Sequence, residues 1–370
     1  MGTSVAGAGV RGSGSAGAVD VLVCGPIGSV IVDGVAMGLA ARRGEPVGHA
    51  VRVLALSPDD DEDTLLDLLH GVRAVVHVAR DPADDLRPPR EREAQVLDTA
   101  TRLFAAIARS GVGRLVLVTS AVLYGPSATN PLPLRESHAL VEPPNAGLVS
   151  VLLAVEELAR QLRGPRPDLR LTLIRPAALV APGIDGDVTR HFAAPRLLGL
   201  RGHPMAWQFC HVHDLAGAIE LALDVTLDPA DPPHPGPGSD AVPLVAVGAV
   251  GWLTDDEVER VCGKRRIDLS EALVFGTAER LQRIGASVSG SLPALVYPWV
   301  VDPARLVAVG WQPRYDNEAA LRALMVEARS VLQEVARRRG REAAGAAGAT
   351  VAALGTALVV RRARRRRHQG

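Results

Sequence analysis

The segment "VLVCGPIGSVIVDGVAMGLAARRG", residues 21–44, decides how the rest of the chain is interpreted. It begins with a short apolar run that ends at Gly25, which is typical of a buried parallel strand. From Ser29 the pattern becomes that of a helix, which Gly44 closes. Gly25 and Gly28 lie between the two, where a dinucleotide loop needs glycines for a tight turn and for close approach to pyrophosphate. The segment therefore predicts a strand–loop–helix unit of the nucleotide-binding type.

The same loop departs from that pattern in several places. Ile31 stands where a third glycine would allow close helix–strand packing, and Pro26 lacks a backbone N–H. An acidic residue at the end of the second strand would hold a ribose hydroxyl, but the residues there are Leu56 and Ser57. Asp59 follows them, and two interpretations of it stay open: it contacts an adenine edge, or it is the N-cap of the next helix.

Beyond this unit, apolar runs alternate with amphipathic segments. Such alternation predicts an α/β protein, a Rossmann-type doubly wound parallel sheet with a small C-terminal substrate-type lobe. The stretch between Gly25 and the third strand is short by about one strand–helix unit. Strands are expected at 49–56, 72–79, 113–120, 169–176 and 242–249, and helices at 57–71, 91–111, 149–162, 253–263 and 317–338.

Composition divides the chain into four parts. Residues 1–18 are Gly, Ser and Ala without a secretory signal, and they predict a disordered segment. Residues 19–180 form the expected Rossmann-like NAD(P)-binding domain. Residues 181–338 form a smaller C-terminal lobe, from which 211–225 and 243–248 return to the Rossmann core. Residues 339–370 are an Ala/Gly-rich and Arg-rich tail.

Six pieces in order resemble the extended short-chain dehydrogenase/reductase family, the NAD-dependent epimerase/dehydratases. They are the glycine loop, "GVRAVVHVA", "ATRLFAAIARSGVGRLVLVTSAVLYG", "LTLIRPAALVAPG", "FCHVHDLAGAIELAL" and "LVAVGWQPRY". The resemblance covers roughly residues 19 to 330. It implies NAD or NADP as the cofactor and a nucleotide or nucleotide-sugar-like small molecule as the ligand. The cofactor-binding positions that it implies are Gly25, Gly28, Asp59 and Ala79.

The chemistry of that family uses a Ser or Thr, a Tyr that acts as acid and base, and a Lys that lowers the pKa of the tyrosine. Ser120 stands at the serine position, so the resemblance implies a catalytic role for it. The tyrosine and lysine positions are Leu148 and Leu152, aligned by the "EEL" that follows. The pair does not recur elsewhere: Arg260 precedes the sole lysine, Lys264, by four residues, and the residues four after the tyrosines are Ala128, Val301 and Ala319. The sequence thus indicates a degenerate member of the family.

Other proton-carrying groups lie near the implied site. Tyr124 follows the same strand as Ser120, and we expect it to pack under the loop rather than to replace the missing phenol. His77, His211 and His213 could offer protons, since an unperturbed histidine changes its charge near neutral pH, yet a role in the fold is the favoured interpretation of each. The three cysteines match no metal-ligand spacing, so no metal site is predicted. Cys24 and Cys210 lie in apolar runs and are expected to be buried free thiols.

The C-terminal tail allows several interpretations. Residues 343–360 are uncharged and lie between arginine clusters, so an interfacial helix on an anionic membrane is one prediction. A basic, solvated tail is the second, and nucleic-acid binding is unlikely because no aromatic residues accompany the arginines. The apolar stripe on the helix that begins at Leu148 suits core or homodimer packing. The body of the protein is expected to be cytoplasmic.

Two functions remain open from the sequence. The first is a nucleotide-binding or scaffolding protein with little or no conventional redox activity. The second is an active NAD(P)-dependent epimerase, dehydratase or reductase on a nucleotide-sugar-like substrate, with an unconventional acid/base. The absence of the Tyr and Lys favours the first hypothesis, and the presence of Ser120 supports the second.

Overall fold

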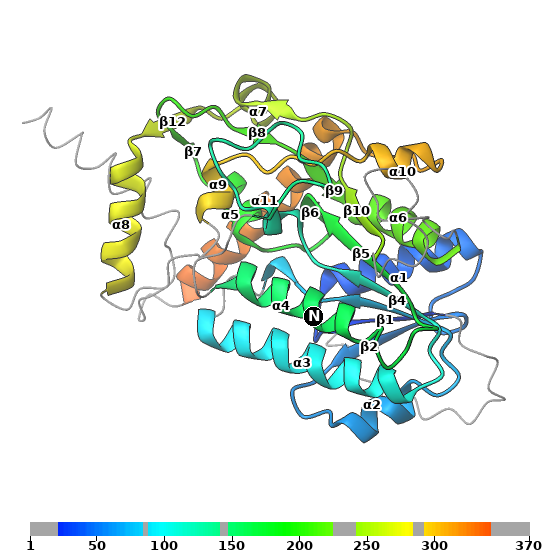
Figure 1. Ribbon diagram of the computed structural model, residues 1–370. Coiled ribbons are helices and arrows are strands. Elements are labelled where there is room, and N and C mark those ends of the chain that lie inside the picture. Colours follow the sequence, from blue (N-terminus) through cyan, green and yellow to red (C-terminus); the bar gives the residue numbers. More distant parts are fainter. Residues whose placement is uncertain (1–20, 84–87, 141–146, 225–241, 284–291, 342–370) are drawn as a thin grey trace, which may run out of the picture.

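The computed structural model describes residues 21–83, 88–140, 147–224, 242–283 and 292–341. Within these ranges the central sheet has six strands, all parallel (Figure 1). Their spatial order is β10 (Leu244–Val247), β5 (Arg170–Pro176), β4 (Arg114–Val118), β3 (Ala74–Val78), β1 (Val21–Pro26) and β2 (Val51–Leu56). The predicted α/β class with a doubly wound parallel sheet is therefore confirmed.

The sheet ends one strand early on the side of β2. In a doubly wound sheet two strands commonly lie beyond the first one on that side. Here the chain passes from β2 through one short helix, α2 (Glu62–Leu68), directly into β3, and residues 57–73 contain no further strand. The shortfall of one strand–helix unit that the sequence indicates is thus present, and it makes β2 an edge strand.

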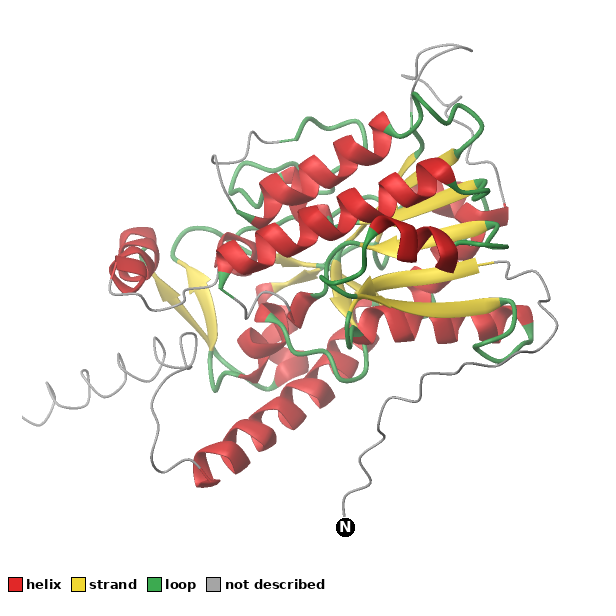
Figure 2. Ribbon diagram, turned by 90° about the horizontal axis from the view of Figure 1, so that it is seen from below, coloured by secondary structure: helices red, strands yellow, loops and turns green. Residues whose placement is uncertain are grey.

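Helices cover both faces of the sheet (Figures 1 and 2). The helices α1 (Val30–Arg43) and α6 (Val212–Asp224) pack together on one face. The other face carries α2, α3 (Pro89–Arg109) and α4 (Leu148–Gln161). A strand between two such layers must be apolar on both sides, which explains the continuous apolar runs in the sequence.

The first strand shows this two-sided burial. Val21 and Val23 belong to the core on the α1 and α6 face, whereas Leu22 and Cys24 belong to the core under α3 and α4. Cys24 and Cys210 are buried and form no disulfide, as predicted. Because successive side chains of a strand point to opposite faces, one short run of residues joins the two cores.

Small residues set the distance between α1 and α6. A Cβ atom added to Gly34 would lie 2.7 Å from Val212 Cγ2, and one added to Gly38 would lie 2.5 Å from Ala216 Cβ. Both separations are well below an ordinary carbon–carbon contact. The two glycines, one helical turn apart, therefore let α6 approach α1 closely, and α6 in turn covers the sheet.

A smaller lobe follows β5, in which the described strands form three pairs. They are β6 (Ala178–Val180) with β9 (Phe209–His211), β7 (Leu197–Leu200) with β12 (Arg266–Leu269), and β8 (Ala206–Trp207) with β11 (Leu253–Thr254). The remaining helices are α5 (Asp187–Ala193), α7 (Asp255–Cys262), α8 (Glu271–Arg283), α9 (Leu292–Val296), α10 (Ala304–Ala308) and α11 (Asn317–Arg341).

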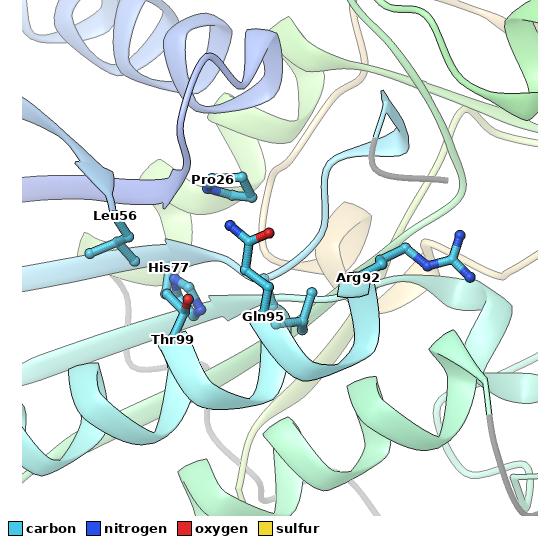
Figure 3. A pocket seen from close by; sticks show the side chains of 8 residues that line it. Pro26, Leu56, His77, Arg92, Gln95 and Thr99 are labelled. Atoms are coloured by element: carbon cyan, nitrogen blue, oxygen red, sulfur yellow. The ribbon is translucent and has the colours of Figure 1, made fainter. Parts of the chain in front are cut away.

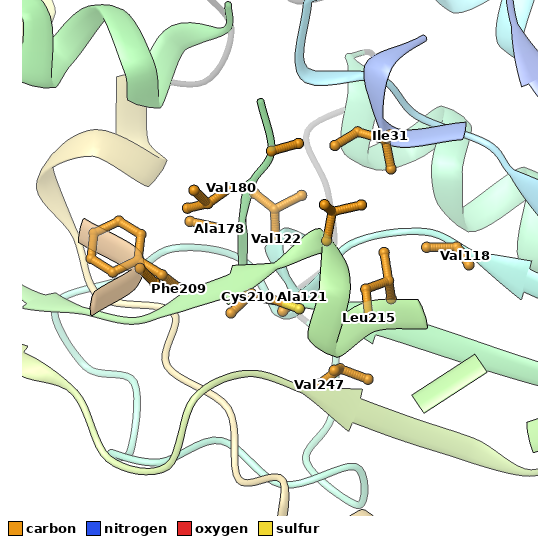
Figure 4. Close-up of a cluster of buried hydrophobic side chains, with 14 of the residues drawn as sticks. Ile31, Val118, Ala121, Val122, Ala178, Val180, Phe209, Cys210, Leu215 and Val247 are labelled. Carbon is orange, nitrogen blue, oxygen red and sulfur yellow. The ribbon is translucent and has the colours of Figure 1, made fainter. Parts of the chain in front are cut away.

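The lobe shares its core with the sheet (Figure 4). Val118 and Val247 come from central strands, whereas Val180 and Phe209 come from the lobe, and all four are buried in one cluster. The hydrophobic core runs across the predicted domain boundary at residue 180 without a break. The division of the chain at that residue stays a prediction.

Helix ends follow the sequence signals closely. The side chain of Ser29 caps α1 by accepting a hydrogen bond from the N–H of Val32, and Gly44 ends that helix with a φ of 69°. Thr254, and not the following Asp255, caps α7, and it does so in a capping box.

Several predictions fall on residues outside the described ranges. These are the disordered N-terminal segment, the Pro/Gly-rich segment 228–240 and the C-terminal tail from residue 342. Among the described residues, no helix has both the length and the apolar character that crossing a bilayer requires.

Candidate functional site

The glycine loop after β1 opens onto the N-terminus of α1. A Cβ atom on Gly25 would lie 2.7 Å from both Val32 Cγ2 and the carbonyl oxygen of Val78, so only glycine fits between β1, β3 and α1. Gly28 has a φ of 73°, and nothing lies within 4 Å of the place where its Cβ would be. Backbone of this kind in front of a helix N-terminus is suited to a pyrophosphate group, because N–H groups and the helix dipole both favour negative charge.

Ile31 adapts to the position of the third glycine by turning into the core. Its side chain is fully buried in the cluster that joins the sheet to the lobe (Figure 4). The substitution therefore contributes to packing behind the loop and leaves the outer surface of the loop open.

Beside this loop lies a hollow at the carboxyl ends of β1, β2 and β3 (Figure 3). The hollow is open to solvent, and α3 forms its other wall. Ligands of open parallel sheets bind in such a crevice, outside the carboxyl ends of the strands. Its lining residues are Pro26, Leu56, His77, Ala79, Arg92, Gln95, Val96 and Thr99.

The four predicted cofactor-binding residues do not all lie at this hollow. Ala79 lines the hollow, and Gly25 and Gly28 lie in the loop at its edge. Asp59 is exposed, and its backbone N–H donates to Ser57 Oγ at 3.2 Å. The interpretation of Asp59 as a helix N-cap is wrong, because Asp61 caps α2: its carboxylate accepts the N–H of Thr64 at 2.8 Å.

Ser120 begins a 3₁₀ turn, Ala121–Tyr124, directly after β4. Its side chain is nearly buried, and its Oγ accepts a hydrogen bond from the N–H of Val122 at 3.2 Å. The hydroxyl proton is not used in that bond.

Leu148 and Leu152 lie one turn apart in α4 and belong to the core beneath it. Leu152 has no exposed surface, and Leu148 is half-buried against the same cluster. Leucine at these positions supplies neither a proton nor a charge. Where the resemblance implies a phenol and an ammonium group, the structure has continuous apolar packing between α4 and the sheet.

A buried polar network lies one turn further along α4. Arg175 donates to Glu156 through Nε at 2.9 Å and Nη2 at 2.7 Å, and Thr119 Oγ1 donates to the same carboxylate at 2.8 Å. Burial raises the pKa of Glu156, but the hydrogen bonds from Arg175 and Thr119 outweigh it and leave that pKa below its usual range. A glutamate in an apolar helix and an arginine in a buried strand were the available sequence signals, and the two carry opposite charges.

Tyr124 belongs to this network and not to an open site. The guanidinium carbon of Arg175 lies 4.9 Å from the centre of its ring, and the side chain is 1% exposed. Burial raises the pKa of Tyr124, against the opposing effect of Arg175. A phenol whose pKa is raised is a poor base near neutrality, so the packing role expected from the sequence fits this geometry.

The three candidate histidines are also built into the fold. Burial lowers the pKa of His77 to about 4, and His77 Nδ1 lies 3.8 Å from Cys24 Sγ. The ring of His211 stacks on Tyr315 at 3.8 Å, and burial together with the nearby His213 lowers the pKa of His211 to about 4. The described residues contain no group of three or more potential ligands arranged to hold a metal ion.

The sole lysine serves the lobe. Lys264 Nζ donates to the carbonyl oxygens of Phe192 and of Ala194, the latter at 2.9 Å, and so binds the C-terminal end of α5. A cation at that end of a helix is favoured by the dipole. This lysine is therefore committed to local structure.

A second cavity lies between the sheet edge and the lobe. Both apolar walls and polar groups line it. Thr189 is 1% exposed, and its Oγ1 has no hydrogen-bond partner among the described residues. Gly186 is required there, because a Cβ would lie 2.8 Å from Pro82 Cβ. Its other lining residues include Arg80, Val122, Asp187, Leu295 and Trp299.

Comparison with known proteins begins with a family model. The model of the NAD-dependent epimerase/dehydratase family matches residues 49–231. Uncharacterized proteins of Mycobacterium tuberculosis and of Mycobacterium bovis are each 32% identical to this chain over 124 residues. That alignment spans 33% of this chain and 33% of each relative, so it covers about a third of the length of either one.

Solved structures match over most of the chain. MoeE5 in complex with UDP-glucose and NAD has a TM-score of 0.59 at 19% identity, over 85% of this chain and 99% of MoeE5. UDP-glucose 4-epimerase from Stenotrophomonas maltophila with bound NAD has a TM-score of 0.62 at 17% identity, over 85% and 99% of the two chains. UDP-glucose 4-epimerase from Thermus thermophilus in complex with NAD has a TM-score of 0.58 at 17% identity, over 84% and 99%.

At these identities the structural likeness concerns the fold, and the family model adds the sequence pattern within it. Within residues 49–231 the chain therefore carries the sequence pattern of the NAD-dependent epimerase/dehydratase family, and its fold is that of the UDP-glucose 4-epimerases.

Proposed function

We propose that this protein binds a dinucleotide, NAD or NADP, and acts as a binding, sensing or scaffolding protein without conventional redox turnover. The observation that carries this proposal is the pair Leu148 and Leu152, which occupies the positions of the family's tyrosine and lysine. A phenol with an ordinary pKa near 10 needs a fixed cation beside it to act as a base at neutral pH. Neither group is supplied here.

The residues present fit the adenosine and pyrophosphate half of a dinucleotide. Nothing lies within 4 Å of the Cβ position of Gly28, which leaves room for a pyrophosphate in front of α1, and the adenosine would lie in the adjoining hollow beside Ala79 and Thr99. The backbone of the loop, and not a charged side chain, is the element that would hold the phosphates. Binding is therefore expected to depend on the shape of the loop.

The nicotinamide half has fewer partners. In the family a lysine holds the ribose of that half, but Leu152 is closed off in the core, and Lys264 is held by carbonyl groups of α5. Ser120 is the one member of the implied catalytic set that the sequence keeps, and we propose that it contacts the ligand through its hydroxyl.

Three proton carriers among the described residues near the sheet edge, Tyr124, His77 and His211, are poorly suited to replace the pair. Burial keeps Tyr124 neutral by raising its pKa, and it keeps His77 neutral by lowering its pKa to about 4. His211 has a pKa of about 4 and is stacked on Tyr315. A general base works best when its pKa lies near the working pH, and none of these three meets that condition.

The second cavity supports a small-molecule ligand in addition to the dinucleotide. The unpartnered Oγ1 of Thr189 and its neighbour Asp187 are polar groups in an otherwise apolar lining, which is the usual composition of a ligand pocket. We propose a nucleotide-sugar-like molecule for this place. The related folds described above were solved with UDP-glucose or NAD bound to them.

A second candidate function is an active epimerase, dehydratase or reductase with an unconventional acid/base. Ser120 and the polar lining of the second cavity, with Asp187 among it, favour this alternative. It requires a group in that cavity to exchange a proton with the substrate. A homodimer through α4 and a membrane contact through the tail, in an otherwise cytoplasmic protein, stay predictions.

Calorimetric titration of the full chain with NAD, NADP and UDP-glucose tests the proposal. The expected result is micromolar binding of a dinucleotide, with neither a change in absorbance at 340 nm nor a new sugar nucleotide on chromatography after incubation with UDP-glucose. Hydride turnover with UDP-glucose or another sugar nucleotide would instead establish the second candidate.

Two glycine variants provide a matched control for the titration. Gly28→Ala and Gly71→Ala both place a Cβ at a positive φ, of 73° and 75°, where nothing lies within 4 Å. Each therefore carries a similar backbone strain. Gly28→Ala alone intrudes on the proposed pyrophosphate position, so it should weaken dinucleotide binding about tenfold, while Gly71→Ala leaves binding unchanged. Equal effects of the two variants on dinucleotide affinity would show that the glycine loop is not the binding site.

A further inference from the structure

The edge strand β2 leaves part of its backbone without a partner. It pairs with β1 on one side, and no described strand lies on its other side. Val21 N–H donates to the carbonyl oxygen of Ala50 at 2.9 Å, so the backbone groups of Ala50 and of every second residue after it point toward β1. Those of the residues between, which include Val53 and Ala55, consequently point to the open side.

Loops close both ends of this open edge. At the start of the strand, the backbone N–H of Gly48 donates to the carbonyl oxygen of Val51 at 2.7 Å. Just after the strand, Oδ2 of Asp60 accepts the backbone N–H of Ser57 at 2.7 Å. Between these contacts lie two outward-facing residues whose N–H and C=O groups have no hydrogen-bond partner among the described residues. The open part of the edge is therefore short and has defined limits.

The side chains of this edge are mostly apolar. Val53 is 38% exposed and Ala55 is also exposed, while Leu54 between them is half-buried on the opposite face. Soluble proteins usually protect an edge strand with charged residues, proline or a bulge, because unpaired backbone groups attract another strand. Arg52 is the one charged residue of β2, and its Nη2 is directed at the carbonyl oxygen of Leu68 in α2. The strand is therefore suited to pairing with another strand.

We propose that β2 pairs with β2 of a second copy of this chain, antiparallel about a two-fold axis at Leu54, so that the two sheets become continuous. In this register Val53 of each copy lies opposite Ala55 of the other. Such opposed residues exchange both of their hydrogen bonds, so all the open backbone groups of the two copies are satisfied. A register centred on Val53 would instead direct Ala55 to Val51, whose carbonyl oxygen already accepts the N–H of Gly48.

The charges at the two ends of β2 support this antiparallel arrangement. Residues 42–52 include three arginines and one glutamate, whereas residues 59–63, after the strand, are all acidic. Asp59 and Asp61 of this acidic run are exposed. An antiparallel pair brings the basic end of one copy beside the acidic end of the other, whereas a parallel pair would bring the two acidic ends together. A second copy therefore matches this edge in charge as well as in hydrogen bonding.

Sedimentation equilibrium of the full chain tests the pairing with the wild type and Val53→Lys. We expect the wild type to be a dimer at micromolar concentration. The lysine should raise the dissociation constant about a hundredfold, because the two-fold axis places its charge at two points of the interface. Val326→Lys puts the same charge on a 57% exposed position of α11, and it should change the constant by less than about twofold. Circular dichroism of each variant confirms that it is folded.

A cysteine at the two-fold axis tests the register. Residues opposed at a non-hydrogen-bonded position of an antiparallel pair have Cα atoms about 4.5 Å apart, a distance that a disulfide can span. Leu54→Cys should therefore give a covalent dimer on oxidation, seen by non-reducing gel electrophoresis. Leu273→Cys, at an exposed position of α8, and the wild type with its own free cysteines are the controls and should stay uncrosslinked.

The remaining outcomes overturn the inference. These are a wild type that is monomeric at every concentration, a dimer that Val53→Lys leaves intact, and a dimer that Leu54→Cys does not crosslink. The last two would assign the contact to another surface, such as the apolar stripe of α4. Equal weakening by Val53→Lys and Val326→Lys would assign the effect to net charge and would also exclude the edge. If Val53→Lys does not fold, the crosslink through Leu54→Cys decides. None of these results depends on nucleotide binding, so the inference is tested apart from the proposed function.

Discussion

Glu156 and Arg175 form a two-point ion pair between α4 and β5 at which the side chains are 0% and 2% exposed. One turn before Glu156 on the same helix stands Leu152, the position of the family's lysine. This helix face therefore carries the ionised Glu156 at one turn and the apolar Leu152 at the turn before it. The pair therefore stabilises the contact between helix and sheet but offers no group to the crevice.

Glu156→Gln is expected to lower the free energy of unfolding by about 3–5 kcal/mol, because it leaves the buried charge of Arg175 without a counter-charge. Glu157→Gln on the exposed side of the same helix should change it by less than about 0.5 kcal/mol. Urea unfolding followed by circular dichroism measures both values. Equal losses in the two variants would show that the ion pair is not the cause.

Stability is expected to fall as the pH drops from about 6.5 to 4, because two fully buried histidines stay neutral in the folded state. The pKa of His77 and that of His191 are each lowered to about 4, first of all by burial. Below a pH of about 6.5 the unfolded chain binds protons that the folded chain does not, so each histidine costs up to roughly 3 kcal/mol at pH 4.

Unfolding curves at a series of pH values measure this slope. His191→Phe should make it shallower, since phenylalanine can keep the stacking on Trp207 that His191 makes at 5.2 Å. His70→Gln, at an exposed position, should leave the slope as it is. A slope that the His191 variant shares with the wild type would exclude this histidine as its source.

The sequence predicted the elements whose signal is local. The strand–loop–helix unit around Gly25 and the caps at Ser29 and Gly44 needed only short-range patterns, and they are present. The resemblance then ordered the remaining strands, including the missing unit beyond β2.

The rest of the site depends on pairing across the fold. The contact of Asp60 with Ser57, and that of Arg102 with the same loop across 42 residues, cannot be deduced from spacing alone. The same is true of the short paired strands of the lobe, which have only two to four residues each. Strands of that length carry too little periodic pattern to be recognised.

Gly38→Ala is expected to destabilise the protein by about 1–3 kcal/mol, although alanine is the better helix former. The added Cβ would lie 2.5 Å from Ala216 Cβ, so α6 would have to move away from α1. Gly276→Ala in α8 is the matched control, because nothing lies within 4 Å of its Cβ position. That variant should gain roughly 0.5–1 kcal/mol. Chemical denaturation measures the free energy of unfolding of both variants. If both were stabilised, close packing of α1 against α6 at Gly38 would be excluded.

Leu152→Lys is the substitution that tests whether the apolar helix face has replaced the catalytic one. Leu152 has no exposed surface and packs in the core that contains Leu123 and Val155. An ammonium group there would be buried beside Glu156, whose oxygens are already occupied by Arg175, Thr119 and Arg160. We therefore expect a loss of about 2–5 kcal/mol, against less than about 1.5 kcal/mol for Leu152→Met.

Urea unfolding of Leu152→Lys and Leu152→Met gives these losses, and NAD titration of the same proteins shows whether the cation reaches the ribose. An apolar, closed helix face predicts an unstable lysine variant with unchanged or weaker NAD binding. A lysine variant as stable as the methionine variant, with tighter NAD binding, would mean that Leu152 borders an open cofactor site. The expected change in NAD affinity has the opposite sign in the two cases. A single pair of variants therefore distinguishes a closed apolar core at Leu152 from an open cofactor site.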